Sequence, residues 1–198
     1  RIFVMGPGQS RKTPEGRVLI GGRWRDEQEW PPRRAVPTPY YIHSAGLLST
    51  RQPSDSAPTR YTFDPRNPVP TISGPLSSEG VLAPRGAMDQ RCRKDLWICG
   101  DSRRLSARND VLVFQTPPLD QDVEVTGRLI VKLWASSTAV DTDFTAKLID
   151  VYPPSPDFPE GVEMNAGDSI VRARYRDSLE RATLMKPGEV YRFTIEMY

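Results

Sequence analysis

Three glycine–X–serine triplets are the first candidates for chemistry in this 198-residue sequence. They are Gly8–Ser10, Gly100–Ser102 and Gly167–Ser169. A nucleophilic serine on the sharp G-x-S-x-G turn needs a second glycine two residues after the serine, with a buried strand before it and a helix after it. None of the triplets has that second glycine, and none lies in that context. The sequence therefore predicts no catalytic serine on such a turn.

A single histidine, His43, stands in the segment PYYIHSAG. A lone histidine cannot build a His-based metal site, which takes several ligands of this kind. A catalytic triad would also need a nucleophilic serine, which none of the three triplets supplies. We therefore predict a structural role for His43 and no catalytic residues in this chain.

Two acidic pairs could bind a cation or work as acid and base. Asp141 and Asp143 lie on the same side of a predicted strand, and Asp120 and Asp122 stand at the start of another. Calcium would need further oxygen ligands around either pair. We expect Asp141 and Asp143 to bond backbone groups at the strand entrance, and we predict no metal and no cofactor. No glycine-rich phosphate loop follows a strand, so nucleotide binding is not indicated.

Cys92 and Cys99 are the only cysteines, within the polar segment RCRKDLWICGD. Two cysteines without a second pair or a nearby histidine cannot form a tetrahedral zinc site. A disulfide that closes this small loop is one state, and two free thiols are the other. We expect free thiols, the usual state in an intracellular enzyme, and favour a cytoplasmic location.

Alternation of apolar and polar residues predicts the elements that position these groups. In Val123–Leu133 the apolar residues recur at every second position, which is typical of a strand with one buried face. Ile130 and Trp134 interrupt the polar face, so we expect this end to be covered on both sides. The alternation resumes at Phe144, Ala146 and Leu148 after the turn SSTAVDTD. This order indicates antiparallel β structure.

The same pattern of apolar and polar residues predicts further strands and loops. Val111–Gln115 is a continuous apolar run that predicts a buried strand, and Val171–Tyr175 and Tyr191–Met197 alternate. Residues 1–60 form an irregular arm, where we expect Trp24 and Trp30 to pin the chain onto the body of the domain. Residues 74–109 show little periodicity and predict a long loop, a kind of segment that is often functional or lies against a partner. The strand-rich core is expected over residues 110–198.

Composition limits the classes of function. Lys+Arg number 27 and Asp+Glu 25, so the formal charge of +2 favours no particular partner, and the short arginine clusters predict no nucleic-acid binding. The mean hydropathy is −0.52, and there is no apolar run of 18 residues, so no membrane partner is expected. A chain of this length can form one domain, residues 1–198.

Eight blocks in fixed order give the sequence a specific resemblance. They are RIFVMG (Arg1–Gly6), GGRWRDEQEWP (Gly21–Pro31), TPYYIHSAGLLS (Thr38–Ser49), YTFDPRNPVPTISG (Tyr61–Gly74), DVLVFQTPPLDQDVEVTG (Asp110–Gly127), SSTAVDTDFTAKLIDVYP (Ser136–Pro153), IVRARYRDS (Ile170–Ser178) and PGEVYRFTIEM (Pro187–Met197). Together they resemble the C-terminal non-catalytic domain of the cocaine-esterase and X-prolyl dipeptidyl aminopeptidase family of serine hydrolases. The resemblance covers nearly the whole chain.

The resemblance implies an all-β fold, a jelly-roll, galactose-binding-like sandwich of two antiparallel sheets with long loops. It implies that the domain packs on the α/β-hydrolase core of the same parent protein, an acyl esterase or X-Pro dipeptidyl-peptidase. The segment Ile72–Leu76 is expected to reach toward the substrate pocket, with Ile72 and Leu76 as substrate-binding residues. Ser73 replaces one glycine of the family's usual pair, and Pro75 stiffens the segment.

Two further expectations complete the reading. Family segments of type NVF-AGHR and SSSNFPR do not follow the last block, so we expect a sandwich truncated at both ends, with bare strand edges that could support a homo-oligomer. The alternative function is a stand-alone carbohydrate-binding module, since many such modules are jelly rolls. Trp24, Trp30, Trp97 and Trp134 could supply its binding face. Two of them exposed on one concave sheet would favour it.

Overall fold

The computed structural model describes residues 1–54, 57–74 and 86–197. In these residues the regular structure is almost entirely β, with three short 3-10 helices. In chain order the elements are β1 (Ile2–Val4), β2 (Arg23–Arg25), β3 (Tyr41–Ile42), η1 (Ser44–Gly46), β4 (Leu48–Ser49), η2 (Leu105–Ala107), β5 (Leu129–Ala135), β6 (Asp143–Tyr152), β7 (Val162–Arg172), η3 (Ala173–Tyr175) and β8 (Tyr191–Met197). The described residues contain no helix long and apolar enough to cross a bilayer. The all-β class predicted from the sequence is confirmed.

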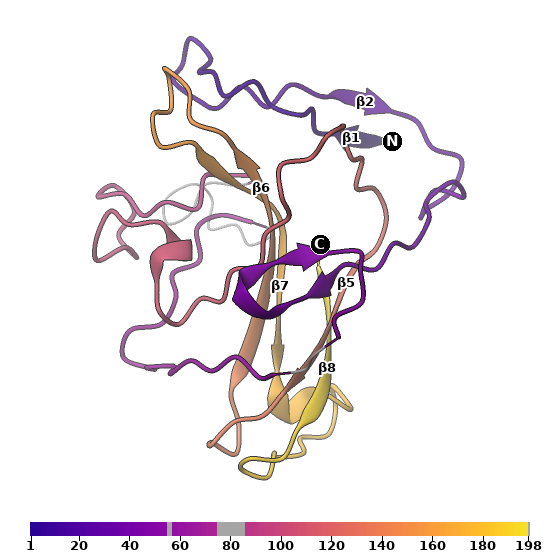
Figure 1. Cartoon of the computed structure of the whole chain (residues 1–198), viewed down its shortest axis with the longest axis vertical. Helices are drawn as coiled ribbons and strands as arrows, with labels where there is room; N and C mark the ends of the chain where they lie inside the picture. The colour runs from indigo at the N-terminus through magenta and orange to yellow at the C-terminus, as the bar shows by residue number, and fades with distance from the viewer. Residues whose placement is uncertain (55–56, 75–85, 198) are drawn as a thin grey trace.

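The last four strands form what we call the strand core. β5 pairs with β8, and β6 pairs with β7, both antiparallel. The β6–β7 ladder is interrupted by a bulge between Leu148 and Ile149. Figure 1 shows these four strands running along the long axis of the molecule, with the β1–β2 pair near one end. The two ladders supply the rigid part of a β-sandwich.

An apolar cluster fills the space between these two ladders. Phe144 from β6 and Phe193 from β8 meet with ring centroids 4.6 Å apart, and Ala173, Met185 and Ile195 pack with them. Phe193 and Ile195 are fully buried, two residues apart, as a strand with one inward face requires. Burying side chains of this size contributes about 1.5–3 kcal/mol each. The inward faces predicted for residues 144–148 and 191–197 are thus confirmed at Phe144, Ala146, Tyr191, Phe193 and Ile195.

The strand predicted from Val123 begins later. β5 starts at Leu129, and Val123 and Val125 lie outside it with about half of their surface exposed. Between them and the strand, Gly127 adopts a φ of 134°, a backbone conformation that side chains disfavour. Period-two alternation reports which face a residue would take, but it does not report whether a partner strand is present. The prediction was therefore right for Leu129, Val131 and Leu133 only.

Three other strand predictions were wrong in part. Ile130 and Trp134, expected to be covered, are exposed on the outer face of β5. The run Val111–Gln115 forms no regular strand, and only its end makes a bridge, between Leu47 and Gln115. β7 ends at Arg172, and the chain then turns into η3, so Tyr175 is not a strand residue. Each of these segments has the right side chains for a strand, but in the described residues it lacks a continuous ladder.

The N-terminal arm is fixed differently from what we expected. Trp24 and Trp30 are about 60% exposed and do not pin the arm. Trp24 instead meets Phe3 edge-on across the β1–β2 pair, with centroids 5.4 Å apart. The arm is held by smaller residues: Met5, Val18 and Ile20 pack against buried side chains at the β6–β7 turn end, namely Tyr152, Val162 and Met164.

Candidate functional site

The segment predicted to reach a substrate pocket is described up to Gly74. Ile72 is 1% exposed and packs with Cys92, Leu96 and Leu105 in a second apolar cluster. Leu76 and Pro75 lie outside the described residues. The side chain of Ile72 therefore points into this domain, so within this chain it acts as an anchor for the residues that follow it. The predicted contact of Ile72 and Leu76 with substrate stays a prediction.

A buried glutamine holds the backbone of this segment. Gln90 is 2% exposed, and its Nε2 donates to the carbonyl oxygens of Ile72 (2.9 Å) and Met88 (3.1 Å). Its own backbone N–H donates to the carbonyl of Glu163 in β7 at 2.8 Å. Gln90 thus connects the Ile72 segment to the strand core. Its Oε1 is buried and has no hydrogen-bond partner among the described residues.

Ser73 and Gly74 complete the anchored turn. Ser73 is fully buried with a φ of 62°, and its hydroxyl donates to the carbonyl of Gly86. Gly74 has a φ of 106°, and a Cβ at this position would lie 2.7–3.1 Å from the carboxylate of Asp168. Only glycine fits such a contact without displacement of one of the two segments. The local hydrogen bond of Ser73 explains how a serine holds the conformation that the family's glycine pair would favour.

The carboxylate under Gly74 belongs to a polar cluster on β7. Asp168 accepts hydrogen bonds from Lys147 Nζ (2.5 Å) and from Asn165 Nδ2 (3.3 Å), and it is opposite Lys147 in the β6–β7 ladder. Asn165 is buried, and in the described part of the chain its Oδ1 has no hydrogen-bond partner. The charge of Asp168 is therefore compensated within the strand core, while the carboxylate supports the turn above it. From the sequence, Asp168 was noted only within an incomplete serine motif, and Gln90, Asn165 and Lys147 were not predicted. The available signal was the presence of two polar residues, Asn165 and Asp168, inside a strand-forming segment.

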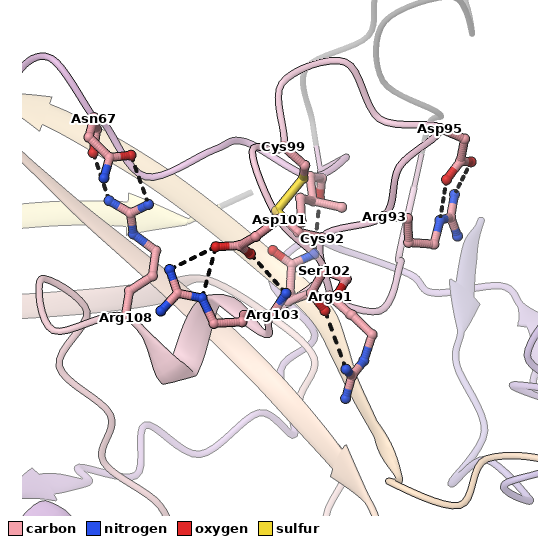
Figure 2. Close-up of a disulfide and its surroundings, with 12 residues drawn as sticks. Asn67, Arg91, Cys92, Arg93, Asp95, Cys99, Asp101, Ser102, Arg103 and Arg108 are labelled. Carbon is pink, nitrogen blue, oxygen red and sulfur yellow. Dashed lines mark hydrogen bonds and ion pairs between the residues drawn. A yellow bond between two sulfur atoms is a disulfide. The ribbon is translucent and has the colours of Figure 1, made fainter.

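Residues 90–105, which we call the cystine loop, begin and end beside β7, where Gln90 and Arg104 bind Glu163. Leu105 N–H donates to the Gln90 carbonyl (2.9 Å) at its base, and Cys92 N–H donates to the Arg103 carbonyl (2.9 Å) one step further out. A disulfide joins Cys92 and Cys99, whose Cα atoms are 5.4 Å apart (Figure 2). The expectation of free thiols was therefore wrong. The disulfide has a local physical cause, because two successive turns, which end at Leu96 and Cys99, fold the loop back and bring the two cysteines together.

Ion pairs tie the base of the cystine loop to the β6–β7 turn. Arg104 bonds Glu163 at 2.9 Å with both side chains mostly buried, and Ser106 Oγ donates to the same carboxylate at 2.8 Å. Arg91 pairs with Glu160. Asp89 accepts from the N–H of Glu163, and burial raises the pKa of its carboxyl. The base of the loop is therefore bonded to the strand core, whereas its tip carries exposed pairs such as Arg93–Asp95 (Figure 2).

A separate charged network clamps the N-terminal arm. Arg25 bonds Glu124 (2.6 Å) and Glu27 (2.6 Å), and Arg34 bonds Glu27 from the other side. Hydrogen bonds from Arg34 lower the pKa of Glu27 to about 2, against the opposing effect of burial. The hydrogen bond from Arg25 likewise lowers the pKa of Glu124 to about 2. These carboxylates are therefore ionised and paired, which suits them to structure and not to proton transfer.

His43 has a serine within hydrogen-bond distance. Its Nε2 lies 2.9 Å from Ser49 Oγ and 2.9 Å from the carbonyl oxygen of Arg51. A carbonyl oxygen only accepts, so Nε2 carries the proton and cannot act as a base toward Ser49. Ser49 Oγ also accepts from the N–H of Arg51. The geometry is that of a tied turn, in agreement with the predicted structural role.

The acidic pair Asp141 and Asp143 stands where the β6 strand begins. Asp141 accepts from the backbone N–H of Arg174 (2.9 Å) and from its Nε (2.6 Å), as predicted for a carboxylate at a strand entrance. Asp143 pairs instead with the guanidinium of Arg172 opposite it. Among the described residues, no three His, Cys, Asp or Glu side chains are grouped as metal ligands.

The tryptophans do not form one binding face. All four are more than half exposed, but Trp24 belongs to β2, Trp134 to β5, and Trp30 and Trp97 lie outside the strands. β2 and β5 are in different sheets. The observation that would favour a carbohydrate-binding module, two exposed tryptophans on one concave sheet, is thus not met in the described residues.

The chain is similar to known proteins along its whole length. The family model of the X-Pro dipeptidyl-peptidase C-terminal non-catalytic domain matches residues 1–198. The sequence is 37% identical to the cocaine esterase of Rhodococcus sp. (strain MB1 Bresler), over 93% of this chain and 31% of that protein.

Two solved structures are similar to this fold. An aminopeptidase from the marine sediment archaeon Thaumarchaeota archaeon has a TM-score of 0.71 and 28% identity, over 89% of this chain and 28% of that one. An α-amino acid ester hydrolase has a TM-score of 0.64 and 29% identity, over 81% of this chain and 25% of that one. The chain therefore spans about a third or less of the length of each of these proteins. With the whole of its length matched, it belongs to the family of X-Pro dipeptidyl-peptidase C-terminal non-catalytic domains.

Proposed function

We propose that this chain is the accessory domain of a serine hydrolase and packs on the α/β-hydrolase core of the same parent protein. The observation that carries the proposal is the family match over residues 1–198, together with relatives about three times as long. The charged clusters around Glu163, Asp168 and Glu27 form ion pairs within this domain, which fits a domain that supports chemistry carried out elsewhere. A homo-oligomer remains a second arrangement to be tested by solution mass.

The proposed reaction of the parent is acyl transfer from an ester or an X-Pro peptide. The similar proteins are named an esterase, an aminopeptidase and an ester hydrolase, and each name describes cleavage of an acyl bond. Such a reaction proceeds through a serine acylated with the help of a histidine base and an oxyanion hole. These groups would come from the hydrolase core.

The contribution that we assign to this chain is to shape the substrate pocket through the segment Ile72–Leu76. Ile72 is buried, Gln90 holds its carbonyl, and Gly74 rests on Asp168. The described end of the segment, Ile72–Gly74, is therefore fixed, and we assign to the apolar side chain of Leu76 the role of an apolar wall of the pocket. Such a wall excludes water and selects the acyl or prolyl group.

The first test compares the isolated chain with the complete product of its reading frame. We expect the chain alone to be inert toward aryl esters and X-Pro anilides, and the complete product to hydrolyse one of the two. Turnover by the chain alone that a serine-directed phosphonate abolishes would overturn the proposal.

Two glycine variants in the complete product test the pocket-shaping role. A Cβ in Gly74→Ala would press on the Asp168 carboxylate and displace the segment, whereas a Cβ in Gly86→Ala meets nothing within 4 Å. Both glycines have positive φ, so the backbone strain is matched. We expect Gly74→Ala to change the ratio of kcat/KM between a small and a bulky acyl group several-fold, and Gly86→Ala to leave that ratio unchanged. Equal ratios in both folded variants would contradict the role.

A further inference from the structure

The cystine loop and the Ile72 anchor share one apolar cluster. Ile72 packs with Cys92, with Leu105 at the base of the loop, and with Leu96, which lies inside the ring that the disulfide closes. Ile98 and Cys99 pack against the same cluster. The disulfide therefore fixes the side chains on which Ile72 rests, and the state of this bond affects the anchor directly.

The two sulfur atoms differ in access. Cys92 is 4% exposed, whereas Cys99 is only partly buried and is followed by the exposed Gly100. We therefore expect a small thiol to attack the bond at Cys99 and not at the buried Cys92. Arginines surround the loop, among them Arg91, Arg93 and Arg103 (Figure 2). Each of the three is paired with a carboxylate: Arg91 with Glu160, Arg93 with Asp95, and Arg103 with Asp101.

We propose that Cys92–Cys99 is a thiol–disulfide exchange site for a small dithiol reductant, and that its reduction releases the Ile72–Gly74 anchor. The release is a property of this domain alone. The further step, that release alters the substrate pocket, rests on the proposed function above.

The exchange balances as a two-electron reaction. A thiolate of the dithiol attacks Cys99 Sγ, the bond to Cys92 breaks, and Cys92 leaves as a thiolate that takes up a proton. The second thiol of the reductant then attacks the mixed disulfide and releases Cys99. The dithiol is oxidised to its cyclic disulfide, and the cystine is reduced to two thiols.

The remaining contacts explain why the effect stays local. At the tip, the reduced loop keeps two turns and the exposed pairs Arg93–Asp95 and Arg103–Asp101, and exposed pairs stabilise little. At the base, Gln90 and Arg104 still bind Glu163 in β7. Reduction should therefore loosen the tip and the Ile72 cluster and leave the β6–β7 ladder intact.

Hydrogen exchange of the whole chain, with and without dithiothreitol, tests the proposal. We expect alkylation with mass spectrometry to find Cys99 modified first. We expect amides in residues 72–74 and 92–100 to exchange roughly 50-fold faster after reduction, from the loop-closure entropy of a ring this small. Amides of β6 and β7 should keep their rates. Reduction only together with global unfolding, or unchanged exchange in 72–74, would overturn the proposal.

Variants separate the redox effect from simple loss of packing. Cys92→Ala with Cys99→Ala should show the fast exchange in both conditions, with no response to the dithiol. Leu96→Ala disturbs the same cluster but keeps the disulfide, so its exchange should still rise on reduction. A response to the dithiol in the double cysteine variant would contradict the assignment. These readouts need no hydrolase assay, so their failure and that of the proposed function are distinguishable.

Discussion

The strand core and the cystine-loop region, residues 72–74 and 86–105, protect their apolar clusters by different means. In the strand core two long ladders face each other, and Phe144, Phe193 and Ile195 fill the space between them. In the cystine-loop region no regular strand surrounds Ile72 and Leu96 in the described residues. A disulfide, a buried glutamine and the ion pair of Arg104 with Glu163 take that role. The first region depends on side-chain volume, and the second depends on a few specific bonds.

The largest effect should come from a cavity in the strand core. Phe193→Ala removes a fully buried ring that packs on Phe144, and it should lower the free energy of unfolding by about 3–5 kcal/mol. Trp134→Ala, on the exposed face of the neighbouring β5, should change it by less than about 0.5 kcal/mol. Urea unfolding measures both. Similar losses of unfolding free energy in the two variants would mean that the core does not lie between the two ladders.

The same contrast explains what the sequence could predict. The alternation in Tyr191–Met197 and in Phe144–Leu148 is a local pattern, and it correctly indicated the core residues of both segments except at their last positions, Met197 and Leu148. The same alternation at Val123 and Val125 failed, because those residues lack a partner strand in the described chain. A pattern along one segment carries no information about which segment lies beside it.

The cystine-loop region was largely beyond prediction for the same reason. Gln90 bonds the carbonyl of Ile72, and Asp168 supports Gly74, over sequence separations that no local pattern links. The segment Ile72–Leu76 was singled out only through the family resemblance, and the disulfide was the alternative that we did not favour. By contrast, the role of Asp141 could be predicted because a carboxylate just before a strand accepts from free backbone N–H groups there, although its partner, Arg174 in η3, could not be predicted.

The second effect concerns the covalent link. Replacing both Cys92 and Cys99 by alanine should lower the free energy of unfolding by about 2.5 kcal/mol, from the loop-closure entropy of a short ring. The wild-type chain in a dithiol reductant should fall to the value of the variant, since both lack the link. A wild-type stability that the reductant leaves unchanged would show that the cluster around Ile72 is held without the disulfide.

A smaller effect is expected at Ser73, where backbone strain and a hydrogen bond oppose each other. Ser73→Ala keeps the φ of 62° but leaves the Gly86 carbonyl with only the longer bond from the Gly74 N–H (3.3 Å), and it should be about 0.5–1.5 kcal/mol less stable. Ser73→Gly loses the same bond but relieves the left-handed strain, so its loss should be smaller by about 1 kcal/mol. Urea unfolding of both decides this. An alanine variant as stable as the glycine variant would show that the backbone at position 73 is not strained.

The smallest effect concerns the arm clamp, and it is a pH dependence. The folded-state pKa values of Glu27 and Glu124 are lowered to about 2, by Arg34 and Arg25 respectively. A carboxyl with a depressed pKa stabilises the fold above its unfolded pKa of about 4.3, and this stabilisation is lost as the pH falls toward the folded value.

Replacing one arginine of the clamp isolates this dependence. Arg34→Gln removes the hydrogen bonds that lower the pKa of Glu27 most, so the Tm of the variant should lie below that of wild type above about pH 5. The gap should narrow as the pH falls toward about 2 and close below it, where Glu27 is protonated in both proteins. Arg33→Gln is the matched control, since Arg33 forms a more exposed pair with Glu29 in the same arm. A gap that does not depend on pH, or the same pH profile in Arg33→Gln, would assign the loss to packing of the long side chain. The arm would then be held like the strand core, by contact area, and the contrast between charged and apolar attachment would be confined to the cystine-loop region.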